Sequence, residues 1–380
     1  MSEVRIFSQR IVTPDGLVCG EAVVRGASIL AVEPKASASR EALDWGADLL
    51  TPGLVDVHTD NLEKHYQPRP GALWDAYGAA LAHDGQCAAA GITTVFDSLA
   101  LHGKNNGLDR KDALAPIISA MDAARADGAL RADHLLHLRC EITDPQLLAN
   151  LEPYVDHPRL KMLSVMDHTP GQRQTANLDR LQERMLANGR SETEVEELLA
   201  NRQFRRDPGI AAPNRRSVVG FAREYGLPLA AHDDACAAHV EEADADGCVI
   251  AEFPVTLEAA RAARSFGMWI VMGGPNFVRG GSHSGNLSAR AAAEAGLLDI
   301  IASDYVPLSM LRTAFLLIDD YGWPPEKALA VVARNPARSV GLHDRGEIAP
   351  GQRADLLRVF RTLGGWPAPV EVWREGRRVA

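Results

Sequence analysis

Short apolar runs alternate with longer alanine-rich stretches along the chain from Thr51 onward. The apolar runs predict strands and the stretches between them predict helices, an alternation typical of a parallel sheet with crossover helices. Eight runs are present, over residues 53–58, 92–96, 134–139, 161–166, 227–231, 249–253, 269–272 and 299–302. Eight βα units predict an α/β fold, a (β/α)8 TIM-like barrel.

The two ends of the chain have a different pattern. Residues 1–51 contain short strand-like runs, at 4–7, 11–13, 22–24 and 28–32, and the turn Pro14-Asp15-Gly16. Turns and short strands return over residues 346–380. We therefore predict a small β-sandwich domain built from residues 1–51 and 346–380, and a barrel domain over residues 52–345.

One segment departs from the regular spacing of the barrel. Residues 171–216, between the fourth and fifth strands, are polar, rich in arginine and glutamate, and helical in pattern. A long βα insertion lies on the face of a barrel that carries active sites, so this segment is a candidate lid. A solvated helical hairpin with i,i+4 ion pairs explains the charge pattern equally well.

Composition and charge narrow the function. The chain has 380 residues, 46% hydrophobic and 24% charged, and a net charge of −10, which argues against binding to nucleic acid. It contains no apolar run of roughly 20 residues, so we expect no contact with a membrane. Residues 1–13 lack the features of a secretory signal, and the five cysteines form no CxxC pair, so we expect a cytoplasmic protein. The sequence leaves a homo-oligomer open.

Residues of metal-ligand type follow several predicted strands. His58 and Asp60 are two positions apart at the end of the first strand, so their side chains share a face. One such pair is often structural, but ligand-type residues also end the third, fourth, fifth and eighth strands. The predicted metal ligands are His58, Asp60, Glu141, His168, His232 and Asp304. Imidazole and carboxylate ligands on one face predict one or two divalent ions, zinc by residue type.

Asp304 has a second predicted role. It lies at the mouth of the last strand, where a carboxylate can bind metal and accept the proton of an attacking water. We therefore take Asp304 as the candidate catalytic base.

Two segments predict contact with an anionic substrate. Residues 273–286 combine glycines with Arg, His and Asn donors, and residues 61–70 add cations directly after the first metal pair. Flexible backbone and cationic side chains are what phosphate recognition requires, although glycine loops are common. The candidate substrate-binding residues are Lys64, His65, Arg69, Asn276, Arg279, Gly280, Gly281 and His283.

Several motifs resemble the amidohydrolase superfamily. Pro52-Gly53-Leu54-Val55-Asp56-Val57-His58 is similar to its first-strand signature, Gly91-Ile92-Thr93-Thr94-Val95 to its second, and Pro350-Gly351-Gln352-Arg353-Ala354-Asp355 to its closing β motif. The resemblance spans nearly the whole chain. It implies a barrel of the amidohydrolase type that activates water on a divalent metal.

A longer set of motifs resembles one branch of that superfamily. The set comprises residues 58–65, 167–172, 232–234, 252–254 and 273–276. The resemblance implies a diphosphatase of phosphonate catabolism, which hydrolyses a small anionic sugar triphosphate, α-D-ribose 1-methylphosphonate 5-triphosphate, to the 5-phosphate and pyrophosphate. The sixth strand carries Glu252 where the superfamily often has a histidine, so Glu252 is a ligand or, like Asp233, a partner that orients one.

Two other functions remain open from the sequence. Another amidohydrolase chemistry, a cyclic amidase or deaminase, fits the same fold, but would have little use for Lys64, Arg69 and Arg279. A barrel that has lost its chemistry and serves as a scaffold is disfavoured by the intact ligand set.

Overall fold

The computed structural model describes residues 3–105, 108–169, 173, 182–183, 185–186, 190–203, 207–282 and 285–380. The chain forms two compact units. Unit 1 comprises Met1–Asp97, Pro116–Leu135 and Ile300–Ala380, and unit 2 comprises Ser98–Ala115 and Leu136–Asp299.

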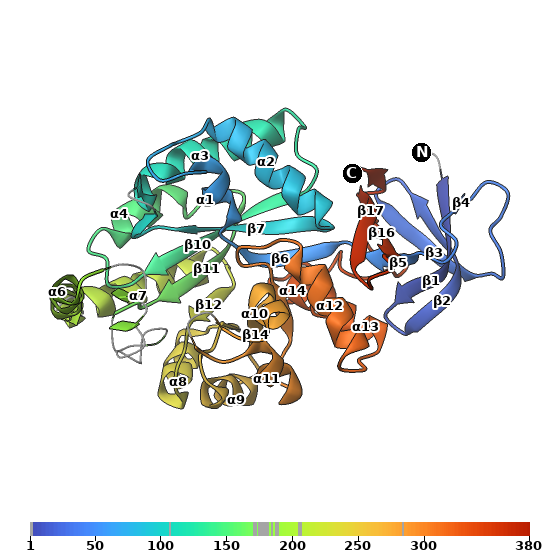
Figure 1. Ribbon diagram of the computed structural model, residues 1–380. Coiled ribbons are helices and arrows are strands. Elements are labelled where there is room, and N and C mark those ends of the chain that lie inside the picture. Colours follow the sequence, from blue (N-terminus) through green and yellow to red (C-terminus); the bar gives the residue numbers. More distant parts are fainter. Residues whose placement is uncertain are drawn as a thin grey trace. The chain divides into compact units, whose positions relative to one another are not determined.

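The two ends of the chain build one mixed sheet in unit 1 (Figure 1). Its strands are β1 (Glu3–Thr13), β2 (Gly16–Arg25), β3 (Ser28–Pro34), β4 (Leu43–Asp44), β5 (Leu49–Pro52), β16 (Leu356–Arg361), β17 (Pro367–Arg374) and β18 (Arg377–Arg378). The order is β18-β17-β16-β5-β1-β2-β3, with β4 beside β1. The predicted joint module of the two termini is thus confirmed as one sheet, while its exact boundaries stay a prediction.

The core of this sheet follows from the alternation along its strands. Ile6 and Ile11 of β1, Leu50 of β5 and Leu356 of β16 are all fully buried and belong to one apolar cluster. The runs 4–7 and 11–13, predicted as separate strands, form a single strand with a register shift between Ser8 and Ile11. An irregularity of this kind lets one long strand bend without ending.

Each of the eight predicted barrel runs forms a strand. The strands are β6 (Leu54–Thr59), β7 (Ile92–Ala100), β10 (Asp133–Glu141), β11 (Leu160–Met166), β12 (Leu229–His232), β13 (Ile250–Glu252), β14 (Trp269–Gly273) and β15 (Ile300–Ala302). Their order is β15-β14-β13-β12-β11-β10-β7-β6, so they follow one another as they do in the sequence. The first and last meet in unit 1, where Thr59 and Asp304 form a parallel bridge. The predicted barrel is therefore confirmed.

Helices occupy the connections between these strands and also follow the last of them. They are α1 (Asn61–Tyr66), α2 (Ala76–Ala89), α3 (Arg110–Ala126), α4 (Leu147–Leu151), the 3-10 helix η1 (Glu152–Tyr154), α6 (Glu192–Gln203), α7 (Pro208–Glu224), α8 (Ala237–Asp246), α9 (Leu257–Ser265), α10 (Gly274–Arg279), α11 (Ala289–Glu294), α12 (Ser309–Asp319), α13 (Pro325–Ala330) and α14 (Arg334–Ser339). A short hairpin of β8 (Lys104–Asn105) and β9 (Leu108–Asp109) precedes α3. None of the described helices is long and apolar enough to cross a membrane.

The predicted insertion at 171–216 lies only partly within the described residues. Its described parts include α6 and the first half of α7, which agree with the predicted helical pattern. The α7 helix begins after Asp207, whose side chain accepts a hydrogen bond from the Gly209 N–H. That contact satisfies a backbone donor at the start of the helix. Movement of the insertion as a lid stays a prediction.

Candidate active site

Ligand-type side chains of unit 2 lie at the carboxyl ends of consecutive strands. Glu141 ends β10, His168 follows β11, His232 ends β12 and Glu252 ends β13. Because these strands are parallel, their carboxyl ends share one edge, which in barrel enzymes carries the active site. The strand assignments made from the sequence for these four residues are confirmed.

His168 lies between two carboxylates. Its Nδ1 is 2.9 Å from Glu141 Oε2, and its Nε2 is 3.4 Å from Asp233 Oδ2. Burial lowers the pKa of His168, but hydrogen bonds to Asp233 and Glu141 outweigh burial and raise the pKa to about 9. The imidazole is therefore a cation at neutral pH in this structure, and a metal ion at this position would replace its proton.

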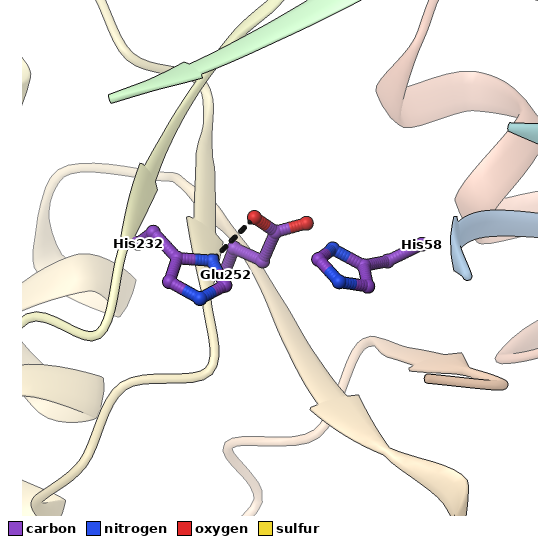
Figure 2. Close-up of side chains that lie close together, drawn as sticks. All are labelled: His58, His232 and Glu252. Carbon is purple, nitrogen blue, oxygen red and sulfur yellow. Dashed lines mark hydrogen bonds and ion pairs between the residues drawn. The ribbon is translucent and has the colours of Figure 1, made fainter. Parts of the chain in front are cut away.

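His232 has a defined tautomer. Its Nδ1 is 2.7 Å from Glu252 Oε2, as Figure 2 shows, and a carboxylate can only accept a hydrogen bond there. Burial lowers the pKa of His232, so the ring is neutral, with its one proton on Nδ1 and a lone pair on Nε2. A carboxylate that fixes a histidine in this way is the usual partner of a metal-ligating ring.

The surroundings of the Nε2 lone pair of His232 show whether a cation would fit there. Asp233 Oδ2 is buried, 3.2 Å from His232 Nε2 and 3.4 Å from His168 Nε2. Two acceptors that face each other need a cation between them. His168, His232 and Asp233 each offer one ligand atom, and these atoms lie within 4.8 Å of one another. The donor set of unit 2 therefore fits a metal ion.

The candidate residues of unit 1 are joined by the backbone of Asp304. The Asp304 N–H donates to the His58 carbonyl at 3.0 Å, and the Asp60 N–H donates to the Asp304 carbonyl at the same distance. His58 is buried, and Asp60 Oδ1 is a buried atom without a hydrogen-bond partner among the described residues. The structure thus brings together the three ligand candidates that the sequence placed on the first and last strands.

Lys64 lies beside this group. Its Nζ donates to the Tyr305 carbonyl at 2.8 Å and lies 4.9 Å from the centre of the Tyr305 ring. Desolvation lowers the pKa of Lys64, and the charges of Asp60 and Asp304 oppose the decrease. The lysine is therefore close enough to both carboxylates for an electrostatic interaction with each.

Three residues at strand ends have a left-handed backbone. Asp233 follows β12 with φ 61°, Phe253 follows β13 with φ 56°, and Asp304 follows β15 with φ 55°. Each donates its N–H to a neighbouring strand, respectively to the carbonyls of Glu252, Val271 and His58. The left-handed turn therefore extends the sheet by one bond and orients the residue that follows the strand.

The predicted substrate contacts stay predictions, and some of their donors are already used within the chain. Asn276 donates to the Leu287 carbonyl and accepts from the Ala289 N–H. The N–H groups of Gly280 and Gly281 bond the carbonyls of Phe277 and Asn276, because Gly280 ends α10 with φ 85°. His65 lies 2.9 Å from Gln86 Oε1, Arg69 and Arg279 are exposed, and His283 lies outside the described residues.

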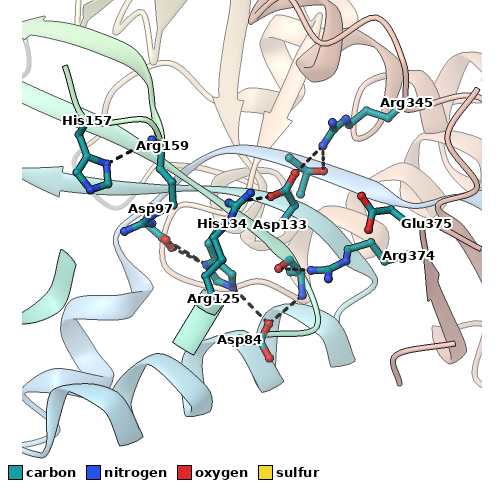
Figure 3. Close-up of polar contacts among 12 residues, drawn as sticks. Asp84, Asp97, Arg125, Asp133, His134, His157, Arg159, Arg345, Arg374 and Glu375 are labelled. Atoms are coloured by element: carbon teal, nitrogen blue, oxygen red, sulfur yellow. Dashed lines mark hydrogen bonds and ion pairs between the residues drawn. The ribbon is translucent and has the colours of Figure 1, made fainter. Parts of the chain in front are cut away.

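Two groups were not predicted from the sequence. Arg139 in β10 lies 3.4 Å from His232 through its NH2 group. The only sequence signal for it is a charge two positions before Glu141 in an apolar run. In unit 1, His83, Asp97 and His134 form a buried cluster, which Asp84 extends. Figure 3 shows Asp84, Asp97 and His134 of this cluster. This cluster joins α2, β7 and β10, so no local motif could indicate it.

Comparison with known proteins agrees with this geometry. Residues 49–379 match the amidohydrolase family. An Escherichia coli (strain K12) protein, alpha-D-ribose 1-methylphosphonate 5-triphosphate diphosphatase, is 41% identical to the chain over 98% of the chain and 99% of its own length.

Two solved structures share the fold. N-acetyl-D-glucosamine-6-phosphate deacetylase from Mycobacterium smegmatis has a TM-score of 0.65 at 16% identity, covering 99% of this chain and 100% of its own. 5-Methylcytosine deaminase from Klebsiella pneumoniae has a TM-score of 0.64 at 14% identity, covering 100% and 98%. These identities are too low to carry function across, but the fold agrees throughout. With the family match over residues 49–379, the chain belongs to the amidohydrolase family.

Proposed function

We propose that this hydrolase cleaves α-D-ribose 1-methylphosphonate 5-triphosphate to the 5-phosphate and pyrophosphate, in phosphonate catabolism and with a divalent metal. The observation that carries the proposal is the 41% identity, over nearly the full length of both chains, to a diphosphatase named for that substrate. Hydrolysis of the bond between the α- and β-phosphoryl groups adds one water and releases pyrophosphate.

The proposed metal ligands of unit 2 are His168, His232 and Asp233, oriented by Glu141 and Glu252. Their support is the converging set of acceptors described above. His58, Asp60 and Asp304 of unit 1 remain proposed ligands from the sequence, as does Glu141, and zinc remains the proposed ion. A bound divalent cation would supply a Lewis acid for a phosphoryl oxygen and would lower the pKa of water.

The chain's own residues divide the remaining work. Asp304 is the proposed base that takes the proton of the attacking water, because the left-handed backbone after β15 holds it beside Asp60. Lys64 supplies positive charge next to these carboxylates, where a multiply charged substrate needs it. Cleavage of a phosphoanhydride depends mainly on positioning and charge neutralisation, so such residues carry much of the rate.

The test is an assay of the purified protein, with the sugar triphosphate and a panel of cyclic amides as substrates and with both phosphate and pyrophosphate measured. We expect one pyrophosphate per triphosphate. Asp304→Asn should lower kcat by roughly 100-fold with KM nearly unchanged. Asparagine tolerates a left-handed backbone as aspartate does, so the fold should survive.

Asp320→Asn, at an exposed helix end, is the matched control and should keep full activity. Hydrolysis of cyclic amides with no pyrophosphate from the triphosphate would contradict the proposed substrate. Full activity of Asp304→Asn would show that another carboxylate is the base.

A further inference from the structure

Arg139 extends from β10 on the same side as Glu141. Residues two apart in a strand share a face, so His137, Arg139 and Glu141 form one row, while Leu138 and Cys140 are fully buried on the other. His137 lies 3.0 Å from both Ser98 Oγ and Ser164 Oγ. Arg139 is therefore the one member of the row between a satisfied polar contact and the predicted ligand Glu141.

The guanidinium of Arg139 has no carboxylate partner among the residues that the structure describes. Its Nε is buried without a hydrogen bond, and its NH2 group lies 3.4 Å from His232 Nε2. By contrast, carboxylates form ion pairs with four buried arginines of the described chain, Arg173, Arg215, Arg345 and Arg353. Arg139 is half-buried, and its charge lowers the pKa of Asp233, but its Nε still has no acceptor.

The acceptor that Arg139 contacts is the atom that a metal ion would also use. An arginine can only donate, so its NH2 group points at the lone pair of His232 Nε2. That lone pair cannot serve both the arginine and a cation. With a cation on His232, Arg139 loses its acceptor and two positive charges become neighbours. An anion that contacts both would restore the balance.

We infer that Arg139 binds a phosphoryl group of the substrate next to His232. The inference deepens the proposed function and rests on it for the identity of the anion. A guanidinium presents several N–H donors in one plane, which match the oxygens of a phosphoryl group and allow two parallel hydrogen bonds. Binding of anion and cation should therefore favour each other, each being stronger when the other is present.

The test compares Arg139→Gln and Arg139→Lys with wild type in the full-length protein. The control is Arg264→Gln, which removes an exposed arginine paired with Asp299 in the same unit. Binding of inorganic phosphate is measured by calorimetry, with and without added metal, beside metal content and thermal midpoint. We expect Arg139→Gln to weaken phosphate binding about 10- to 100-fold, the scale of a lost charge-assisted hydrogen bond. Arg139→Lys should recover part of the affinity.

The thermal midpoint distinguishes a role of Arg139 in substrate binding from a role in folding. Because Arg139 forms no ion pair with a described carboxylate, Arg139→Gln should leave the thermal midpoint unchanged or raise it while kcat/KM for the triphosphate falls. A lowered midpoint with unchanged phosphate affinity would overturn the inference. So would equal phosphate affinity in wild type, Arg139→Gln and Arg264→Gln.

The inference and the proposed function fail separately. If wild type does not hydrolyse the sugar triphosphate, yet Arg139→Gln loses phosphate binding, the anion site stands and the proposed substrate is wrong. If wild type hydrolyses the triphosphate and Arg139→Gln does so within about twofold of wild type, with unchanged phosphate binding, the role of Arg139 is refuted and the proposed function survives.

Discussion

At the scale of single residues, backbone strain is concentrated where the chemistry is proposed. A non-glycine residue in a left-handed conformation costs on the order of 1 kcal/mol or more, and the cost is largest for bulky side chains. Phe253 has this left-handed conformation, and its ring lies 5.5 Å from the His232 ring, nearly perpendicular to it. The strain after β13 therefore helps to fix the plane of a predicted ligand.

Replacing Glu252 by Gln should weaken metal binding without removing it. The glutamine oxygen can still accept the proton of His232 Nδ1, but the negative charge that makes the ring a better ligand is lost. Loss of such a partner typically lowers metal affinity about 10- to 100-fold. The measurement is competition with a chelator, and His232→Gln should lose more affinity than Glu252→Gln. Equal affinity of Glu252→Gln and wild type would show that this contact does not tune a metal ligand.

The residue types on the strand ends were predictable from the sequence, but their relations were not. His232 and Glu252 could be selected because each ends an apolar run. Their hydrogen bond depends on the register between β12 and β13, which places His232 opposite Glu252. The absence of an ion pair at Arg139 among the described residues depends on side chains from other strands, which no local pattern encodes.

At the scale of elements, a buried ionic network ties the segment before β16 to β7 and β10 in unit 1. Arg353 bonds Asp355, Thr94 Oγ1 and Asp133, and Arg345 bonds the same threonine and Asp133. Figure 3 shows Arg345 and Asp133 in this network. Asp355 is almost fully buried, and burial raises its pKa despite the guanidinium of Arg353. The charged form of Asp355 is thus stabilised by its ion pair with Arg353.

Arg353→Ala should lower the free energy of unfolding by about 3 kcal/mol, because it leaves a buried carboxylate unpaired. Urea denaturation at neutral pH measures the loss. The deficit should shrink at acid pH, where Asp355 is neutral. Arg25→Ala, which removes an exposed ion pair with Glu3, is the control and should cost at most about 1 kcal/mol. Similar losses in both variants would contradict the importance of burial.

The elements themselves were largely predictable, for a physical reason. Strands buried on both faces are continuous apolar runs, and the observed β7 and β10 extend the predicted runs by only a few residues into polar positions. The irregularity that keeps β1 a single strand was missed, because Ser8-Gln9-Arg10 is polar and resembles a turn. The short hairpin β8–β9 has no apolar pattern and could not be found that way.

At the scale of the whole molecule, unit 1 contains charged groups far from water. His134 lies 3.0 Å from Asp97 Oδ2 and 3.4 Å from Asp84 Oδ1, and His83 lies 2.9 Å from Asp97 Oδ1. Burial lowers the pKa of His134, but the charge of Asp97 and a hydrogen bond to Asp84 raise it to about 9. Burial raises the pKa of Asp97, yet the two histidines hold it below its usual range. The protonated His134 thus stabilises both carboxylates inside unit 1.

This cluster predicts how stability depends on pH. The pKa of His134 is raised on folding, so its contribution is fully present below the unfolded value of about 6.5 and is lost as pH rises through about 9. We expect the free energy of unfolding to fall by about 3 kcal/mol over that window. Asp97 acts at the other end, where its contribution is lost as pH falls below about 3.9.

His134→Gln is the matching variant. It should be less stable than wild type near pH 6.5 and should show a flatter dependence up to about pH 9, measured by urea denaturation at each pH. His343→Gln, on a residue outside the cluster, should follow the wild-type curve. A wild-type slope in His134→Gln would assign the alkaline loss to other groups.

The position of β5 governs when unit 1 can be completed. β5 pairs with β1 on one side and with β16 on the other, and it ends at Pro52, whereas β16 begins at Leu356. At roughly 5–20 residues per second, a ribosome needs about 15–60 seconds to make the chain between these strands. Throughout that time the nascent β5 presents an unpaired strand edge, a place where newly made chains can pair wrongly. Translation speed and chaperone supply should therefore influence the yield of folded protein more strongly than the stability of the folded state influences it.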